Sequence, residues 1–135
     1  FRYNKLALIN INKKKNFRKK IIKYGNCYII NRNTDNKFLF IRRPHKGLLG
    51  GMLSFPSSIW VKDKKSISND KLFENLIKNK KIKNHIHHTF SHFKLILNVY
   101  DINIDYKIDI EGQWIDLDEA IGQLPSLMKK VANII

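Results

Sequence analysis

The sequence contains little cysteine, few acidic residues and no long apolar run. Cys27 is the only cysteine, which excludes an internal disulfide, and one thiol cannot by itself supply a zinc or iron–sulfur site. We expect Cys27 to be a small buried strand residue. No apolar run approaches the ~18 residues that a membrane span requires, and no segment has the pattern of a signal peptide. These absences predict a soluble, intracellular protein in a reducing cytoplasm, with no membrane partner.

Positive charge dominates the composition and is concentrated in the first third of the chain. Lys and Arg number 26 against 11 Asp and Glu, which gives a net charge of +15. Residues 1–46 hold 14 basic residues and one acid, Asp35, whereas residues 84–135 hold 4 basic and 7 acidic residues. Such a one-sided distribution favours phosphate contact by one end of the molecule, and a solvated lysine-rich tail is the alternative.

The length suits one domain preceded by a basic segment. A chain of 135 residues that is 43% hydrophobic can bury one core. Residues 1–20 are basic and show little apolar periodicity, so we interpret them as an interdomain connector, and we expect the compact domain to span residues 21–135. Because the chain begins with Phe1 rather than methionine, we also expect a further N-terminal part of the protein.

The first half of the chain predicts a hairpin, a structured loop and an extended segment. Two β-prone runs, 23–31 and 37–42, flank turn-forming residues at 33–36. Three glycines within 44–51 permit backbone conformations or close approaches that side chains would block, so this loop should be structured. Residues 54–61 should be extended.

The second half predicts helices that alternate with strands. An amphipathic helix should be capped by Ser68 or Asn69 and end near Lys80. A second hairpin spans 85–104, and the remaining elements are a short strand at 113–115, a helical turn from Asp118 and a final helix at 126–135. This order predicts an α/β (α+β) fold, a mixed-sheet sandwich with helices packed on its faces.

Three motifs stand out in order along the chain, at 42–56, at 88–93 and at 114–131. As a set they resemble the C-terminal domain of MutY-type adenine DNA glycosylases. The run from Arg42 to Met52 followed by Phe55-Pro56 is similar to the family's arginine-proline, glycine-leucine, glycine-glycine and phenylalanine-proline segment. The other two are His88–Phe93, which resembles the lesion-reading loop, and Trp114 with Leu124–Val131, which resembles the C-terminal signature. The resemblance implies a Nudix-like α/β/α sandwich that recognises 8-oxoguanine opposite adenine in DNA.

The resemblance also implies which residues contact DNA. Phe90, Ser91 and His92 would form the reading loop, with Ser91 facing the lesion and His92 supporting it or reaching the backbone. 8-Oxoguanine carries a donor at N7 and a carbonyl at C8, and a serine hydroxyl can both donate and accept. A solvent-facing serine at a strand end is the alternative for Ser91, and Phe90 is either a core residue or faces DNA.

Basic residues before the glycines are candidates for contact with the DNA backbone, namely Arg42, Arg43, His45 and Lys46. Such contacts position a domain without reading the base sequence, and a solvated loop is the alternative. Four histidines crowd a short segment (His85, His87, His88 and His92), but a closed zinc site needs four ligands and no cysteine or carboxylate lies nearby in sequence. We therefore predict no metal site in this chain.

A nucleotide pyrophosphatase is the enzymatic alternative, but the sequence lacks the glutamate cluster that this activity requires. Nudix hydrolases begin their active-site loop at the same segment, and they need several glutamates on one helix to hold Mg²⁺. Here Glu74 is the only glutamate between Pro56 and Asp109. A fold can be retained while its chemistry is lost. A generic basic nucleic-acid-binding module is the other alternative.

The resemblance finally implies what this chain lacks. Adenine excision would be carried out by an N-terminal glycosylase domain of the same protein that holds a [4Fe-4S] cluster, so we expect no catalytic residue and no cofactor in this chain. The expected partners are this domain and duplex DNA containing 8-oxoguanine·adenine pairs. The expected location is the nucleoid of a bacterial cytoplasm.

Overall fold

The structure is a computed structural model that describes residues 20–105 and 110–135. Residues 1–19 of the predicted connector lie outside the described residues. The elements are, in chain order, β1 (Ile21–Arg32), β2 (Lys37–Arg42), β3 (Leu53–Ser54), the 3-10 helix η1 (Lys64–Ser66), α2 (Lys71–Ile77), β4 (Asn84–Thr89), β5 (Phe93–Ile104), β6 (Gln113–Ile115), α3 (Leu117–Ile121) and α4 (Ser126–Ala132).

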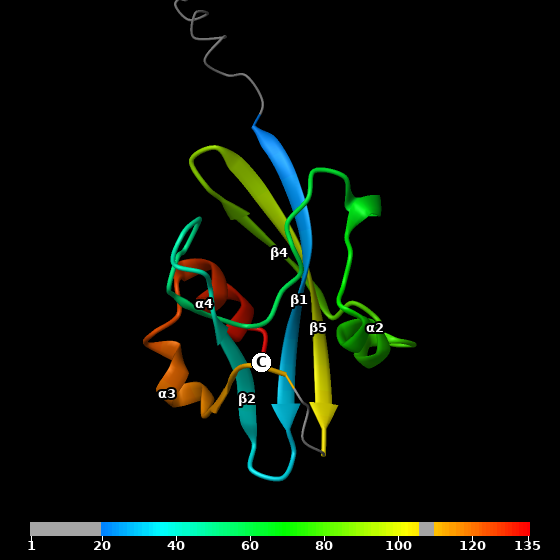
Figure 1. The fold of residues 1–135 in the computed structure, drawn as a ribbon, viewed down its shortest axis with the longest axis vertical. Helices are drawn as coiled ribbons and strands as arrows, with labels where there is room; N and C mark the ends of the chain where they lie inside the picture. The colour runs from blue at the N-terminus through cyan, green and yellow to red at the C-terminus, as the bar shows by residue number, and fades with distance from the viewer. Residues whose placement is uncertain (1–19, 106–109) are drawn as a thin grey trace, which may run out of the picture.

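A mixed sheet of six strands forms the centre of the fold. Its strands lie in the order β3-β2-β1-β5-β4, and β6 pairs with β2. β1 and β5 pair in parallel along their whole length, with Ile21 opposite Phe93, while the other pairs are antiparallel. Figure 1 shows α2 on one side of the sheet and α3 and α4 on the other. The predicted mixed α/β sandwich is therefore confirmed.

Helices on both faces create two hydrophobic cores. Side chains alternate along β1, so Cys27 and Ile29 pack toward α4, whereas Tyr28 and Ile30 pack toward α2. All four side chains are fully buried. A strand covered on both faces reads as a continuous apolar run, which is what this stretch of β1 shows. On the α2 side, the Tyr28 ring stacks on Phe73 with 4.5 Å between centroids.

The predicted amphipathic helix corresponds to α2, which is shorter than predicted at both ends. Its N-cap is Asp70, because the Asn69 side chain turns to the sheet and accepts hydrogen bonds from Asn26 Nδ2, at 3.0 Å, and from the Tyr28 hydroxyl. It ends at Ile77 because Asn79 adopts the left-handed conformation, with φ 65°, that commonly terminates helices. The helices at the C-terminal end also differ by a few residues, since α3 begins at Leu117 and α4 ends at Ala132. No helix of the described residues is long and apolar enough to cross a membrane.

The segment after β3 is extended, but little of it belongs to a strand. Only Leu53 and Ser54 pair with β2. The following residues are fastened to β1 instead, since Tyr24 and Val61 exchange two backbone hydrogen bonds of 2.7 and 2.9 Å and Ser58 donates to the Asn26 carbonyl at 2.9 Å. This segment therefore runs antiparallel beside the first half of β1 and holds Trp60 next to that strand.

Candidate functional site

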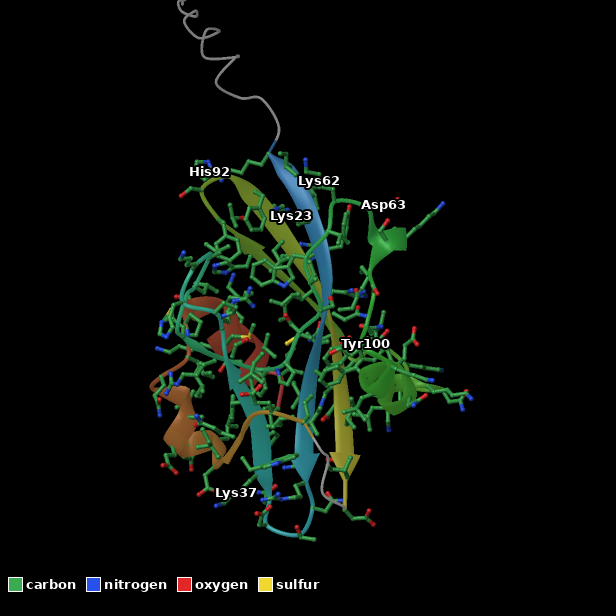
Figure 2. The ribbon with its side chains drawn as sticks, viewed as in Figure 1. Lys23, Lys37, Lys62, Asp63, His92 and Tyr100 are labelled. Atoms are coloured by element: carbon green, nitrogen blue, oxygen red, sulfur yellow. The ribbon has the colours of Figure 1, made fainter. Side chains whose placement is uncertain are left out.

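A tight turn between β4 and β5 carries the predicted reading residues at one end of the molecule, and we call it the reading turn after that predicted role. β4 and β5 pair up to Thr89 opposite Lys94, and the Phe90 amide donates to the Phe93 carbonyl at 2.8 Å to close the turn. Ser91 and His92 are exposed at its tip, and Figure 2 shows His92 at the end of this hairpin. The sheet therefore fixes both ends of this turn, while the tip of the turn is exposed and can contact a partner.

The turn rests on four ring side chains, His88, Trp60, Phe90 and Phe93, which we call the aromatic cluster. Phe90 lies 4.8 Å from Phe93, 4.8 Å from His88 and 5.9 Å from Trp60, measured between ring centroids. Phe90 is half-buried and packs against the larger core, so it belongs to the base of the turn and not to its exposed tip. The aromatic cluster therefore supports the exposed pair.

Two cations lie on the faces of this cluster. The Arg43 guanidinium lies 4.6 Å from the centroid of Trp60, and the Lys23 ammonium lies 4.6 Å from the centroid of Phe93. A pocket of about 420 Å³ is bounded by both cations, both rings and several apolar side chains, among them Leu48 and Ile59. Burial lowers the pKa of Arg43, which is half-buried. The pocket is therefore cationic and largely apolar.

The glycines of the loop between β2 and β3 fix the position of Arg43. Gly47 and Gly51 have positive φ angles of 102° and 74°, and a Cβ on Gly50 would lie 2.1 Å from the His45 carbonyl oxygen. The loop closes because the Gly51 amide donates to the Arg43 carbonyl at 3.0 Å, and Arg43 Nε donates to the Leu48 carbonyl at 3.3 Å. The prediction that these glycines permit special backbone geometry is confirmed.

The structure brings together only part of the predicted set. Arg43 reaches the turn through Trp60, whereas Arg42 donates to the Gly51 carbonyl at 3.3 Å and to Gln123 Oε1 at 3.1 Å, away from the aromatic cluster. His45 and Lys46 are exposed on the glycine loop and make no described contact with the turn.

Three residues of this region were not identified from sequence. They are Lys20, whose Nζ donates to the Phe90 carbonyl at 3.1 Å, together with Lys23 and Trp60. A signal for Trp60 was present, because it is the one aromatic residue between Phe55 and Phe73. Nothing in the local pattern distinguishes the two lysines from the many others.

The histidines of β4 have separate surroundings and do not converge. His85 shares a 2.9 Å hydrogen bond with Asn98, while His88 Nδ1 is buried without a partner among the described residues. Burial lowers the pKa of His88, and the charge of nearby Lys130 lowers it further. Within residues 20–105 and 110–135, no three His, Cys, Asp or Glu side chains are grouped so that they could hold a metal ion.

The pocket beside α2 is poor in carboxylates. It measures about 300 Å³ and is lined by hydroxyl, amide, aromatic and aliphatic side chains, with Asp70 as its one acidic residue. Glu74 is the only acid within α2 itself. A polar chain crosses the sheet here, since Asn98 donates to Asn26 at 3.1 Å and Asn26 donates to Asn69. Neutral amides therefore occupy the interior beside this helix.

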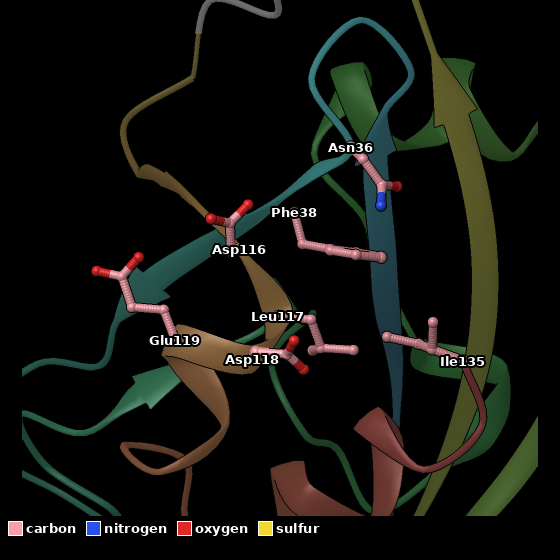
Figure 3. A pocket seen from close by; sticks show the side chains of 7 residues that line it. All are labelled: Asn36, Phe38, Asp116, Leu117, Asp118, Glu119 and Ile135. Atoms are coloured by element: carbon pink, nitrogen blue, oxygen red, sulfur yellow. The ribbon is translucent and has the colours of Figure 1, made fainter.

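Acidic side chains gather at the opposite end of the sheet. Figure 3 shows a pocket of about 480 Å³ beside the β1–β2 turn, lined by Asn36, Phe38, Asp116, Leu117, Asp118, Glu119 and Ile135. Figure 2 places Lys37, which begins β2, far from His92. The reading turn therefore lies at the end of the molecule that is remote from the acidic pocket.

Comparison with known proteins identifies the family. The sequence model of the NUDIX domain matches residues 27–133. The chain belongs to the NUDIX domain family. Because the match runs from β1 to the end of α4, it includes both cores, the glycine loop and the reading turn. The Nudix-like fold expected from the sequence motifs is therefore confirmed.

Solved structures of the same fold include proteins of different kinds. The NUDIX domain is similar to the C-terminal domain of mouse MUTYH, solved in complex with human PCNA, at 20% identity over 87% of each chain and a TM-score of 0.60. It is similar to the MutT protein of Methanosarcina mazei Go1 at 16% identity, 84% and 91% coverage and a TM-score of 0.60. The dihydroneopterin triphosphate pyrophosphohydrolase of E. coli shares 9% identity, with 84% and 97% coverage and a TM-score of 0.56. No functionally curated protein matches the chain in sequence.

Proposed function

We propose that this NUDIX domain recognises 8-oxoguanine paired with adenine in duplex DNA, as the C-terminal domain of a MutY-type adenine DNA glycosylase. The observation that carries the proposal is the exposed Ser91–His92 tip, seated on the aromatic cluster next to Arg43. The similarity in fold to the mouse MUTYH domain supports the same assignment.

The turn offers hydrogen-bonding groups suited to the altered base edge. The Ser91 hydroxyl can accept from N7–H or donate to the C8 carbonyl of 8-oxoguanine, whereas unmodified guanine has only an acceptor at N7. Because a hydroxyl also adapts to guanine, backbone groups of the turn would contribute to the preference. The hydrogen bond between Phe90 and Phe93 holds these groups before DNA arrives, which reduces the entropy lost on binding.

The surroundings of the turn suit a polyanion. Arg43 lies beside the turn, and His45 and Lys46 are exposed on the neighbouring glycine loop, where they would contact phosphates. Arg42 would contribute as the arginine that positions the loop through Gly51. The 8-oxoguanine·adenine duplex is thus the proposed ligand, held by the backbone and read by the turn.

Nucleotide hydrolysis is a weaker candidate for the same fold. Activation of a diphosphate by Mg²⁺ requires a cluster of carboxylates, and the pocket beside α2 offers Asp70, with Glu74 as the one acid in the helix. Magnesium-dependent turnover of 8-oxo-dGTP by the purified chain would favour the pyrophosphatase. We expect no turnover above a reaction without protein.

Adenine removal is assigned to a separate part of the proposed enzyme. A preceding N-terminal glycosylase domain with a [4Fe-4S] cluster would flip the adenine from the duplex and cleave its glycosidic bond, while this domain marks the opposite base. The chain would therefore increase the selectivity of excision without taking part in bond cleavage.

The decisive experiment compares two duplexes that differ only in the lesion. Affinities for 8-oxoguanine·adenine and guanine·adenine duplexes are measured at several salt concentrations, so that the phosphate contribution can be separated. We expect a preference for the lesion that persists at high salt, and Ser91→Ala should lower it by about 1–3 kcal/mol. Ser66→Ala, at an exposed serine of η1, is the matched control and should retain the preference. Equal affinities that disappear together with salt would indicate a generic basic module.

A further inference from the structure

Three cations lie around the reading turn, and two of them, Lys20 and Lys23, have been given no role so far. Lys20 donates to the carbonyl of Phe90, Lys23 lies over Phe93, and Arg43 lies over Trp60. All three are therefore held by the turn or by the aromatic cluster below it. Their shared position is a feature that the sequence does not suggest, because they come from the start of β1 and from the loop after β2.

These cations retain donors that no group of the described residues uses. A lysine ammonium has three donors, and Lys20 uses one of them for Phe90. A guanidinium has five, of which Arg43 directs Nε to the Leu48 carbonyl. Stacking on a ring leaves the edge of the guanidinium open to donate two hydrogen bonds to one phosphate group.

No carboxylate neutralises the three cations within the described part of the chain. The ion pairs there are Arg32 with Asp35 and Lys83 with Asp101, and neither pair lies in this region. A half-buried guanidinium loses hydration, and an anionic ligand would restore favourable contacts to it. Charge complementarity therefore points to an anion as the occupant of the pocket between Lys23 and Arg43.

The apolar side of the same pocket narrows the class of anion. Ile59 is 82% exposed and Leu48 is 42% exposed, and both border the pocket together with the two cations. The backbone on both sides of Ile59 is hydrogen-bonded to β1, so the backbone that carries this exposed side chain is held in place. A sugar–phosphate unit combines a charged group with a weakly polar ring and matches both sides of this pocket.

We propose that Lys23 and Arg43 bind a backbone phosphate of DNA in this pocket, with the attached deoxyribose against Ile59 and Leu48, and that Lys20 extends the contact to the turn. This inference rests on the proposed function, because it assumes that DNA approaches the reading turn. The site fixes the register of the backbone, so that the lesion is presented to Ser91. It adds Lys20, Lys23, Leu48 and Ile59 to the DNA-contacting surface.

The salt dependence of DNA binding tests this phosphate site directly. The logarithm of the binding constant for an undamaged duplex is plotted against the logarithm of salt concentration for wild type and variants. This slope is negative, and loss of one phosphate contact decreases its magnitude by about 0.9. We expect this decrease for Lys23→Ala and for Lys20→Ala, a decrease of about twice that size for the double variant, and recovery of the wild-type slope in Lys23→Arg.

Lys80→Ala is the matched control, because Lys80 is an exposed lysine that follows α2 on the other face of the sheet. It removes the same charge and should leave the slope unchanged. A slope for Lys23→Ala equal to that of Lys80→Ala would overturn the phosphate site. Thermal unfolding of each variant confirms that it is folded, and Lys23→Gln provides a second neutral substitution that keeps a long side chain.

The two proposals fail in different ways in this experiment. Lesion preference is the ratio of affinities for two duplexes with the same backbone, so it reports on the reading turn, whereas the slope reports on phosphates. A decreased slope in Lys23→Ala without any lesion preference in wild type would retain the phosphate site and overturn the reading function. A lesion preference in wild type together with an unchanged slope in Lys23→Ala would retain the reading function and overturn the phosphate site.

Discussion

The indole of Trp60 stacks on the ring of Phe90, with 5.9 Å between centroids and 27° between planes. This contact joins the segment after β3 to the turn between β4 and β5. Because Arg43 lies on the same indole, the glycine loop is connected to the reading turn through one side chain. Displacement of Trp60 should therefore change the positions of both the glycine loop and the reading turn.

Gly25→Ala tests the connection through Trp60. A Cβ at Gly25 would lie 2.7 Å from Trp60 Cδ1, so the ring must shift, and we expect a loss of about 1–3 kcal/mol in the free energy of unfolding, typical of overpacking. Urea unfolding gives the stability, and the fluorescence of Trp60, measured in a Trp114→Phe background, reports the displaced ring. Gly122→Ala is the control, because a Cβ there meets no atom within 4 Å. Equal stability of the two variants would show that the ring adapts freely.

The stability of the domain should fall as the pH falls through about 6.5, the ordinary histidine pKa. Burial and the charge of Lys130 lower the pKa of His88 in the folded chain, so the unfolded chain binds a proton more readily and acid favours unfolding. In His88→Gln, unfolding midpoints at about pH 7.5 and about pH 5.5 should differ less than in wild type. Lys130→Gln should also reduce the difference, since it removes one cause of the shift. An unchanged pH dependence in both variants would contradict this assignment.

Cys27 should be unreactive in the folded chain. Burial raises the pKa of its thiol to about 12, so that almost no thiolate is present near neutral pH and the sulfur is shielded from reagents. Alkylation by iodoacetamide, followed by mass spectrometry, should be slow in buffer and become fast only in concentrated urea. Rapid labelling without denaturant would mean that the core around β1 opens frequently.

Local signals predicted the elements whose limits are set locally. The turn residues 33–36 precede β2, whose limits agree with the prediction. The glycine loop was predicted because Gly47 and Gly51 can adopt the positive φ angles that the loop requires. The start of α2 was wrong because Asn69 is engaged by Tyr28 from another strand. Such a contact between distant residues leaves no trace in the pattern around residue 69.

The same distinction applies to the site. A sequence motif proposed Ser91 as a reading residue. Trp60, Lys20 and Lys23 were missed because their partners lie far away in sequence. The prediction grouped Arg42 with Arg43, but neighbouring residues of a strand direct their side chains to opposite faces. The structure assigns Arg43 to the aromatic cluster and Arg42 to Gln123.

The parallel pairing of β1 with β5 has a consequence for how the chain is made. Ile21 is paired with Phe93, so the ribosome must synthesise 72 further residues after Ile21 before this pairing can begin. Until then β1 can pair only with β2 and with the segment after β3, and the edge of the apolar run at residues 27–30 that β5 later covers is open to chaperones and other nascent chains. The yield of folded protein should therefore depend on how quickly translation proceeds from β1 to β5.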